Sequence, residues 1–172
     1  DISLNLIIGP MFSGKTTELL RITKRLISIN LNVLLLNYHE DTRYSTTEMS
    51  THDKTSLPCI FVKDLNEIKY DEYDIICINE AQFFHHLVKF CKEALEKNKT
   101  LYICGLDGDY KQEKFGEILD LVPLADNITK LHAFCTVCKN TTPAYFTKRI
   151  CESTEQKLIG TNEYMPVCRK HI

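Results

Sequence analysis

Residues 9–16 read Gly9-Pro10-Met11-Phe12-Ser13-Gly14-Lys15-Thr16. They fit the pattern G-x-x-x-x-G-K-[ST], in which a glycine-rich loop turns its backbone N–H groups toward phosphate oxygens. An apolar run, Leu4 to Ile8, precedes the motif. After it, apolar residues recur at the spacing of one helix face, at Leu19, Ile22, Leu26 and Ile29. A strand, a loop and a helix therefore predict a phosphate site, in which Lys15 reaches the β- and γ-phosphates and the Thr16 hydroxyl binds Mg²⁺.

Further apolar runs have the length of strands, and they span Val33 to Leu36, Ile60 to Val62, Ile75 to Ile78 and Leu101 to Cys104. The runs are continuous rather than alternating, which is typical of strands buried on both faces of a parallel sheet. A second helix is expected after Gln82, where one face would carry Phe84, Leu87, Val88, Cys91, Ala94 and Leu95. Strands that alternate with helices predict an α/β fold, a P-loop-type parallel sheet flanked by helices.

The character of the sequence changes near residue 131, where helical periodicity is lost and cysteines gather. We predict a nucleotide-binding α/β domain over residues 1–131 and a small metal-binding module over residues 132–172. The polar stretch from Asp41 to Pro58 is expected to be a loop.

Length and composition limit the function classes. At about 150 residues per domain, the 172 residues make one domain with a small appendage. Hydrophobic residues at 44% exclude a disordered chain, and no run approaches the roughly 18 apolar residues of a membrane span.

The first residues show no secretory signal, so we expect a cytoplasmic protein without a membrane partner. The net charge of −2 argues against a nucleic-acid partner, because sequence-blind nucleic-acid binders are normally basic.

Eight cysteines are the unusual feature of the composition, and reduced thiols or metal binding are expected for a cytoplasmic chain. Cys135 and Cys138 form C-x₂-C, and Cys168 and His171 form C-x₂-H near the end of the sequence. Two chelating pairs around a segment predict a closed tetrahedral Zn²⁺ site with a structural role. The apolar surroundings of Cys59, Cys77, Cys91 and Cys104 predict core positions, and Cys151 has no assigned role.

The apolar run from Ile75 to Ile78 ends in two polar residues, Asn79 and Glu80. Open α/β sheets bind ligands at the carboxyl ends of their strands. Phosphate sites of this type usually place a Mg²⁺-binding Asp here, so Asn79 is the candidate for that position. If the reaction is phosphoryl transfer to a hydroxyl, Glu80 is the candidate general base. The alternative is that Glu80 is only a solvated acid at a strand end.

Several blocks together resemble cytosolic-type thymidine kinases, in the same order and over nearly the whole chain. The resemblance rests on residues 9–16, on both cysteine pairs and on four further blocks. These are Asn79-Glu80-Ala81-Gln82-Phe83-Phe84, Leu106-Asp107-Gly108 with Phe115-Gly116, Leu121-Val122-Pro123-Leu124-Ala125, and Thr147-Lys148-Arg149. The sequence differs from the family pattern in having Asn79 for Asp, Ala81 for Gly and His171 for the fourth Cys.

The resemblance implies ATP-dependent phosphorylation of the 5′-hydroxyl of thymidine, with deoxyuridine as an alternative substrate, in nucleotide salvage for DNA synthesis. It further implies Mg²⁺, structural Zn²⁺, inhibition by dTTP, a homotetramer, and a lasso-like loop of the zinc module over the nucleoside. In this chain Glu80 would be the base, and Thr16 and Asn79 would hold Mg²⁺. Residues 9–16 and Arg43 would bind the ATP phosphates. The nucleoside would contact Met11, Phe83, Leu106, Tyr110, Phe115, Thr147, Leu158, Gly160 and Tyr164.

Two other functions use the same motifs. One is a P-loop ATPase or GTPase switch whose zinc module binds a protein partner. The other is a zinc-ribbon nucleic-acid binder, which the balanced charge disfavours. Stimulation of ADP formation by a nucleoside would separate the kinase from both.

Overall fold

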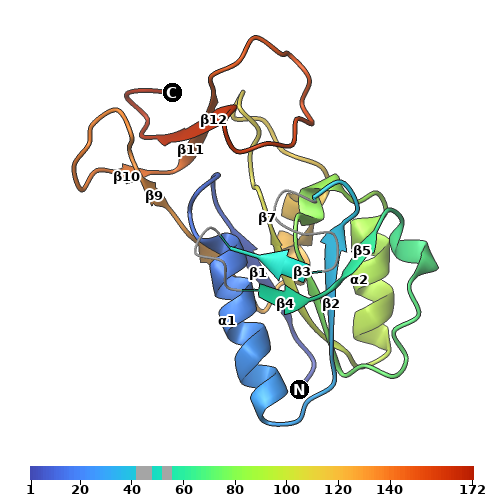
Figure 1. Cartoon of the computed structure of the whole chain (residues 1–172). Coiled ribbons are helices and arrows are strands. Elements are labelled where there is room, and N and C mark those ends of the chain that lie inside the picture. Colours follow the sequence, from blue (N-terminus) through green and yellow to red (C-terminus); the bar gives the residue numbers. More distant parts are fainter. Residues whose placement is uncertain (42–47, 52–55) are drawn as a thin grey trace.

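The computed structural model describes residues 1–41, 48–51 and 56–172. Its centre is a six-stranded sheet in the order β5-β2-β6-β7-β1-β8. All strand pairings within this sheet are parallel. The strands span Ile60–Val62 (β5), Val33–Tyr38 (β2), Ile75–Ile78 (β6), Thr100–Gly105 (β7), Leu4–Ile8 (β1) and Asn127–Lys130 (β8). Their carboxyl ends therefore share one edge of the sheet (Figure 1).

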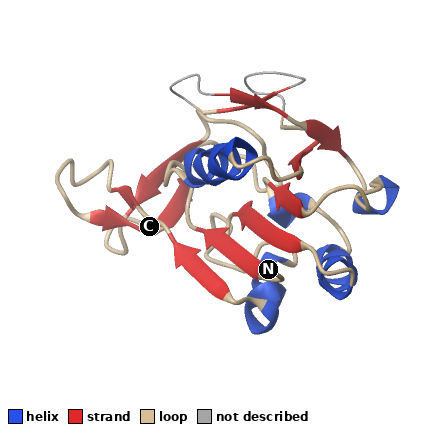
Figure 2. Cartoon of the chain, turned by 90° about the horizontal axis from the view of Figure 1, so that it is seen from below, coloured by secondary structure: helices blue, strands red, loops and turns tan. Residues whose placement is uncertain are grey.

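Helices cover both faces of the sheet, as Figure 2 shows. Helix α1 (Lys15–Ser28) packs on one face, where Leu19 and Leu20 join a buried cluster. The other face carries α2 (Leu87–Glu96) and the short 3₁₀ helices, which are η1 (Leu65–Glu67), η2 (Ala81–Phe83) and η3 (Ile118–Leu124). The predicted α/β layering is confirmed.

The five predicted strands are all present, within two residues of the predicted ends. Strand β8 was not predicted, because its four residues are all exposed and only Ile128 among them is apolar. It is held by parallel pairing with β1 and by the preceding Asp126, whose Oδ2 accepts a hydrogen bond from the Leu4 N–H at 2.8 Å. An edge strand of this kind has no apolar pattern by which to be recognised.

The helix predictions are correct in existence and wrong at their ends. Ile29 follows α1 and is 66% exposed, so it is not part of the buried face. The second helix begins at Leu87 rather than after Gln82. Phe84 is buried but precedes that helix, because the chain first makes η2 and then a left-handed turn at His86, with φ of 59°.

The loop prediction for residues 41–58 is wrong where the structure describes them. Residues 48–50 form β3 (Glu48–Ser50) and pair antiparallel with β4 (Ser56–Pro58). The Met49 side chain is 1% exposed and packs in the cluster under α1. One buried methionine in a polar stretch is too weak a signal to predict a strand.

The last forty or so residues form two small antiparallel pairs at the carboxyl edge of the main sheet (Figure 1). Strands β9 (Ala133–Phe134) and β10 (Pro143–Ala144) make one pair, and β11 (Phe146–Arg149) and β12 (Tyr164–Val167) make the other. They share a small buried cluster of Ala133, Cys135, Ala144, Val167 and Cys168. The division at residue 131 remains a prediction. Within the described ranges, no helix has both the length and the apolar character needed to cross a bilayer.

Replacing Leu36 by Ala should lower the free energy of unfolding by about 2–5 kcal/mol, because Leu36 is fully buried in the central strand β2. Ile2→Ala is the control and should change it by less than about 0.5 kcal/mol, since Ile2 is exposed. Urea unfolding followed by circular dichroism measures both. Equal destabilisation by the two variants would contradict the packing described here.

Candidate functional site

The loop of residues 9–14, called here the 9–14 loop, joins β1 to α1 and needs glycine at both ends. Gly9 has φ of 153°, and a Cβ there would lie 2.6 Å from the Leu131 carbonyl oxygen. Gly14 adopts the left-handed conformation, φ 84°, immediately before α1. Residues with a side chain rarely take these conformations. The loop closes on itself, because Ser13 Oγ donates to the Pro10 carbonyl at 2.8 Å.

The 9–14 loop places the first residues of α1 at the carboxyl edge of the sheet. Lys15 is only 8% exposed, and its Nζ donates to the Pro10 carbonyl at 2.6 Å. The lysine is thus folded inside the loop, beside the first N–H groups of a helix. This combination of a cation and helix N–H groups suits an anion such as phosphate. Arg43, also predicted to contact phosphate, lies outside the described residues.

A chain of neutral side chains runs from α1 to the middle of the sheet. Thr16 Oγ1 donates to Asn79 Oδ1 at 3.4 Å, and Asn79 Nδ2 donates to Asn37 Oδ1 at 3.4 Å. Asn79 is 1% exposed at the end of β6, so its amide cannot turn to solvent. The structure brings together the two residues predicted to hold Mg²⁺. A hydroxyl and an amide oxygen are oxygen ligands of the kind that hard cations take.

Glu80 is held in an unusual position directly after Asn79. Its backbone is left-handed, with φ of 54°, which costs of order 1–3 kcal/mol for a residue with a side chain. Its carboxylate accepts a hydrogen bond from Gln82 Nε2 at 3.0 Å. Gln82 is 3% exposed, and its Oε1 accepts from the Leu106 N–H at 3.0 Å. Gln82 therefore fixes the Glu80 carboxylate relative to the segment that follows β7.

Sequence reasoning did not single out Gln82. The available signal was a polar residue between Ala81 and two phenylalanines, because a buried amide in an apolar block must find partners.

Glu80 lines a cavity beside the 9–14 loop. All nine predicted nucleoside-contacting residues line it, namely Met11, Phe83, Leu106, Tyr110, Phe115, Thr147, Leu158, Gly160 and Tyr164. Ile159 also lines it, within the stretch Leu158-Ile159-Gly160 whose main chain the family resemblance implies would hydrogen-bond the base. Gly108, Asp109 and Gln156 line it too, and none of these three was predicted. The residues come from the 9–14 loop, η2, the segment after β7 and the C-terminal strands, so the cavity exists only in the folded chain. Their roles in binding remain predictions.

Aromatic side chains give the cavity flat walls. The Phe83 and Phe115 rings meet edge to face, with centroids 5.4 Å apart. The Tyr38 ring also packs against Phe83, with 5.0 Å between the two ring centroids. At the other end, the Met11 N–H donates to Thr147 Oγ1 at 2.9 Å. That hydrogen bond joins the 9–14 loop to β11. A flat apolar slot with polar groups at its ends suits a planar heterocycle attached to a sugar.

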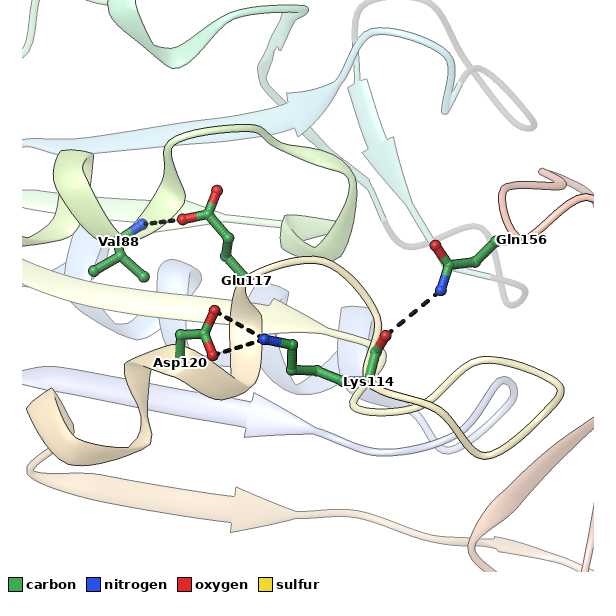
Figure 3. Close-up of polar contacts among 5 residues, drawn as sticks. All are labelled: Val88, Lys114, Glu117, Asp120 and Gln156. Atoms are coloured by element: carbon green, nitrogen blue, oxygen red, sulfur yellow. Dashed lines mark hydrogen bonds and ion pairs between the residues drawn. The ribbon is translucent and has the colours of Figure 1, made fainter.

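The wall that contains Phe115 is anchored to α2. Where α2 begins, the Glu117 carboxylate accepts from the backbone N–H of His86 at 2.7 Å. It also accepts from the N–H of Val88 at 3.4 Å (Figure 3). Lys114 Nζ binds both carboxylate oxygens of Asp120, at 2.9 and 3.2 Å. These contacts fix the segment that carries one side of the cavity.

Residues 150–163 connect β11 to β12, and this 150–163 loop closes the cavity. Gln156 Nε2 donates to Asp109 Oδ2 at 2.8 Å. It also donates to the Lys114 carbonyl at 3.5 Å (Figure 3). The Tyr110 hydroxyl donates to the Thr154 carbonyl at 3.0 Å. Asp109 and Gln156 could not be recognised from sequence, because nothing in their surroundings marks them as partners.

The four predicted metal ligands converge in the C-terminal part. The ligand atoms of Cys135, Cys138, Cys168 and His171 all lie within 4.8 Å of one another. Sulfur atoms of Cys138 and Cys168 are 3.8 Å apart, and His171 Nδ1 lies 3.3–3.6 Å from the three sulfurs. Tetrahedral Zn²⁺ with Zn–S bonds of about 2.3 Å separates two sulfurs by about 3.8 Å. The donor set and its spacing therefore suit a structural metal such as zinc.

The thiols of the cluster differ from one another. Burial, together with the neighbouring sulfurs of Cys135 and Cys168, raises the pKa of Cys138. Burial alone would raise the pKa of Cys135, but hydrogen bonds from the backbone at Cys138, Cys168 and Val137 outweigh it and lower the pKa to about 6. A thiolate is the form that binds metal. In the core, burial raises the pKa of Cys77, Cys91 and Cys104 to about 12. The core prediction is confirmed for these three, and Cys59 is half-buried at the core margin.

Comparison with known proteins gives a consistent result. A family model described as thymidine kinase matches residues 2–172. A thymidine kinase of Oryza sativa subsp. japonica is 43% identical over 178 residues, covering 98% of this chain and 65% of the rice protein. The thymidine kinase of Yaba monkey tumor virus is 41% identical over 96% of this chain and 92% of its own length. The cytosolic thymidine kinase of Gallus gallus is 39% identical over 96% of this chain and 75% of its own length. The chain thus spans slightly less than two thirds of the rice protein.

Protein purified without chelator should contain about one zinc per chain, because the four ligands form a closed tetrahedral set. Cys168→Ala should lose the metal, whereas His171→Cys should keep it, since a fourth thiolate is also a normal ligand. Elemental analysis measures the zinc. Cys151→Ser is the control and should retain full zinc, because Cys151 is exposed and outside the cluster. Full zinc in Cys168→Ala would contradict this assignment.

Proposed function

The chain belongs to the thymidine kinase family, and on that premise we propose that it transfers the γ-phosphoryl group of ATP to the 5′-hydroxyl of thymidine. One observation carries the proposal. A single cavity has flat aromatic walls, contains the Glu80 carboxylate, and reaches the 9–14 loop through Met11. Nucleoside, base and phosphate donor would therefore meet at one place.

In this proposal the thymine ring lies in the slot beside Phe83 and Phe115. Backbone groups of the 150–163 loop, near Leu158 and Gly160, hydrogen-bond the polar edges of the ring. A site that leaves a buried polar group unpaired rejects a ligand lacking the matching group strongly, whereas one missing methyl is worth only about 1–3 kcal/mol. Deoxyuridine differs from thymidine by that methyl group, so it is expected to be a weaker substrate rather than an excluded one.

The ATP phosphates lie in the 9–14 loop, with Lys15 and the N–H groups at the start of α1 directed at them. The neighbouring oxygens of Thr16 and Asn79 fit a hard cation, so they are the residues that would hold Mg²⁺. When bound, Mg²⁺ neutralises phosphate charge during the transfer. A phosphate contact from Arg43 is part of the same proposal.

Glu80 accepts the proton of the 5′-hydroxyl as that oxygen attacks phosphorus. The transition state of phosphoryl transfer is loose, so catalysis depends mainly on positioning and charge. Gln82 contributes by holding one carboxylate oxygen of Glu80 at 3.0 Å, which orients the carboxylate at the cavity.

Four wider properties belong to the proposal. Inhibition by dTTP is supported by the cavity adjoining the 9–14 loop, because one molecule could then occupy both. A homotetramer is supported by an exposed hollow of mainly apolar side chains beside α1, lined by Ile22, Arg25, Leu26, Ser28, Ile29 and Tyr102. A cytoplasmic location is supported by the chicken relative, whose name includes "cytosolic". The biological role would be nucleotide salvage for DNA synthesis.

Thymidine should stimulate ADP formation from ATP and Mg²⁺, with thymidine monophosphate as the second product. The reaction is measured by coupled ADP assay and by chromatography of the products. Deoxyuridine should react with lower kcat/KM, by roughly 10- to 200-fold for one methyl group. Thymidine-independent ATP hydrolysis at the same rate, without stimulation by any pyrimidine deoxynucleoside, would instead support the switch function.

Glu80→Gln should lower kcat by about 10²–10⁴-fold, because the amide cannot take the hydroxyl proton. KM values for thymidine and ATP should change little, since the amide oxygen can still accept from Gln82. Glu96→Gln, at the exposed end of α2, is the matched control and should keep wild-type kinetics. Unchanged kcat in Glu80→Gln would exclude Glu80 as the base.

A further inference from the structure

The 150–163 loop has a fixed internal shape that centres on Arg149. Its guanidinium donates to the carbonyls of Ser153 at 3.0 Å and Gln156 at 3.2 Å, and also to that of Glu155. The same group donates to the Tyr164 hydroxyl at 2.8 Å and lies 3.9 Å from the centre of the Tyr110 ring. The loop is therefore preformed around one cation.

Two neighbouring residues of the loop attach it to two different walls of the cavity. Gln156 binds Asp109 on the segment after β7. Lys157 crosses to the end of β2, where its Nζ lies 2.9 Å from Glu40 Oε2 and donates to the Tyr38 hydroxyl. The contacts of Lys157 have no counterpart in the predicted roles of the site residues.

The Lys157 attachment is more than a surface ion pair, which alone contributes little. The ammonium lies 4.5 Å from the centre of the Tyr38 ring and 5.8 Å from that of Phe83. Tyr38 is 6% exposed, so the lysine is fastened to a rigid part of the core. Hydrogen bonding to Lys157 lowers the pKa of Glu40, so the carboxylate is charged at neutral pH. Attraction of a cation to an aromatic face adds to the ion pair.

We propose that Lys157 is a positioning residue for the nucleoside: it fastens the 150–163 loop to Tyr38 and Glu40 and so places its pocket-lining neighbours Leu158 to Gly160. This rests on the proposed function only in taking the nucleoside to be thymidine. Without Lys157 the loop would keep its contacts with Arg149, with Tyr164 and with the segment after β7. It would lose its attachment to the end of β2, and binding would have to bring it back to that position.

The proposal predicts which kinetic constants change. Ordering the loop in advance lowers the cost of binding the nucleoside, and the loop is remote in sequence from the 9–14 loop that would hold ATP. Loss of Lys157 should therefore raise KM for thymidine and leave KM for ATP and kcat nearly unchanged. That pattern marks lost binding common to ground state and transition state.

The test compares Lys157→Met, Lys157→Glu, Glu40→Lys and the double variant Lys157→Glu/Glu40→Lys. We expect KM for thymidine to rise at least threefold in Lys157→Met and about tenfold in Lys157→Glu, in which two acidic groups face each other. The double variant restores opposite charges and should return to within twofold of wild type. An unchanged KM in both Lys157 variants, an equal rise in KM for ATP, or no restoration in the double variant would overturn the proposal.

Lys97 supplies the matched control, because it has the same kind of surroundings away from the cavity. Its Nζ lies 4.9 Å from the centre of the Tyr70 ring and 3.6 Å from Asp71 Oδ1. Lys97→Met should leave all kinetic constants unchanged. An equal rise in KM for thymidine in Lys97→Met would show that the effect is not specific to Lys157, and would overturn the proposal.

Amide hydrogen exchange of the protein without ligand separates this proposal from the proposed function. Exchange over residues 150–163 should be faster in Lys157→Met than in wild type and in Lys97→Met. If thymidine proves not to be a substrate, this difference still supports the attachment. Equal exchange in the three proteins would refute it, whatever the substrate.

Discussion

Parallel pairing of the six central strands is the constraint on which the other features depend. Because every strand runs the same way, each chain segment that leaves a strand emerges at the same edge. The 9–14 loop after β1, Glu40 after β2, Glu80 after β6 and Leu106 after β7 all occupy that edge. Ligand sites of open α/β sheets form there for the same reason. The small C-terminal strands then supply the remaining side of the cavity.

The C-terminal part lacks the apolar material to hold its own shape. Its buried cluster consists of five residues, and two of these are predicted metal ligands. Four converging ligands replace the core that such a short segment cannot build. They fix β11 and β12, and these strands carry Thr147, Arg149 and Tyr164 to the cavity. The cluster of metal ligands thus affects the cavity indirectly, by fixing the backbone of the strands that line it.

The sequence predicts local features much better than contacts between distant segments. Gly9, Gly14 and Lys15 belong to a compact motif, which predicted the strand, loop and helix found there. The buried strands have long apolar runs and were also predicted correctly. Strand β8 was missed because an exposed edge strand has no hydrophobic pattern. Gln82 and Lys157 were missed for another reason. Their importance lies in partners that the fold brings near, such as Leu106 for Gln82 and Glu40 for Lys157. The cavity residues come from four distant segments of the chain. The resemblance to a family grouped them, because a periodic sequence pattern relates only residues that are near one another in the chain.

The order in which the sheet can assemble follows from β1. Leu4 pairs with Leu101 on one side, and Asn5 pairs with Asn127 on the other. During synthesis this apolar strand is made well before both of its neighbours, β7 and β8. Until then, the backbone N–H and C=O groups of this apolar strand have no strand partner on either side. Unpaired apolar strands of this kind promote aggregation. The hydrogen bond between the 9–14 loop and β11 forms later still, because the Met11 N–H has its partner only when Thr147 has been synthesised. Neither the sheet around β1 nor the hydrogen bond at Met11 can therefore form before these later segments have been made.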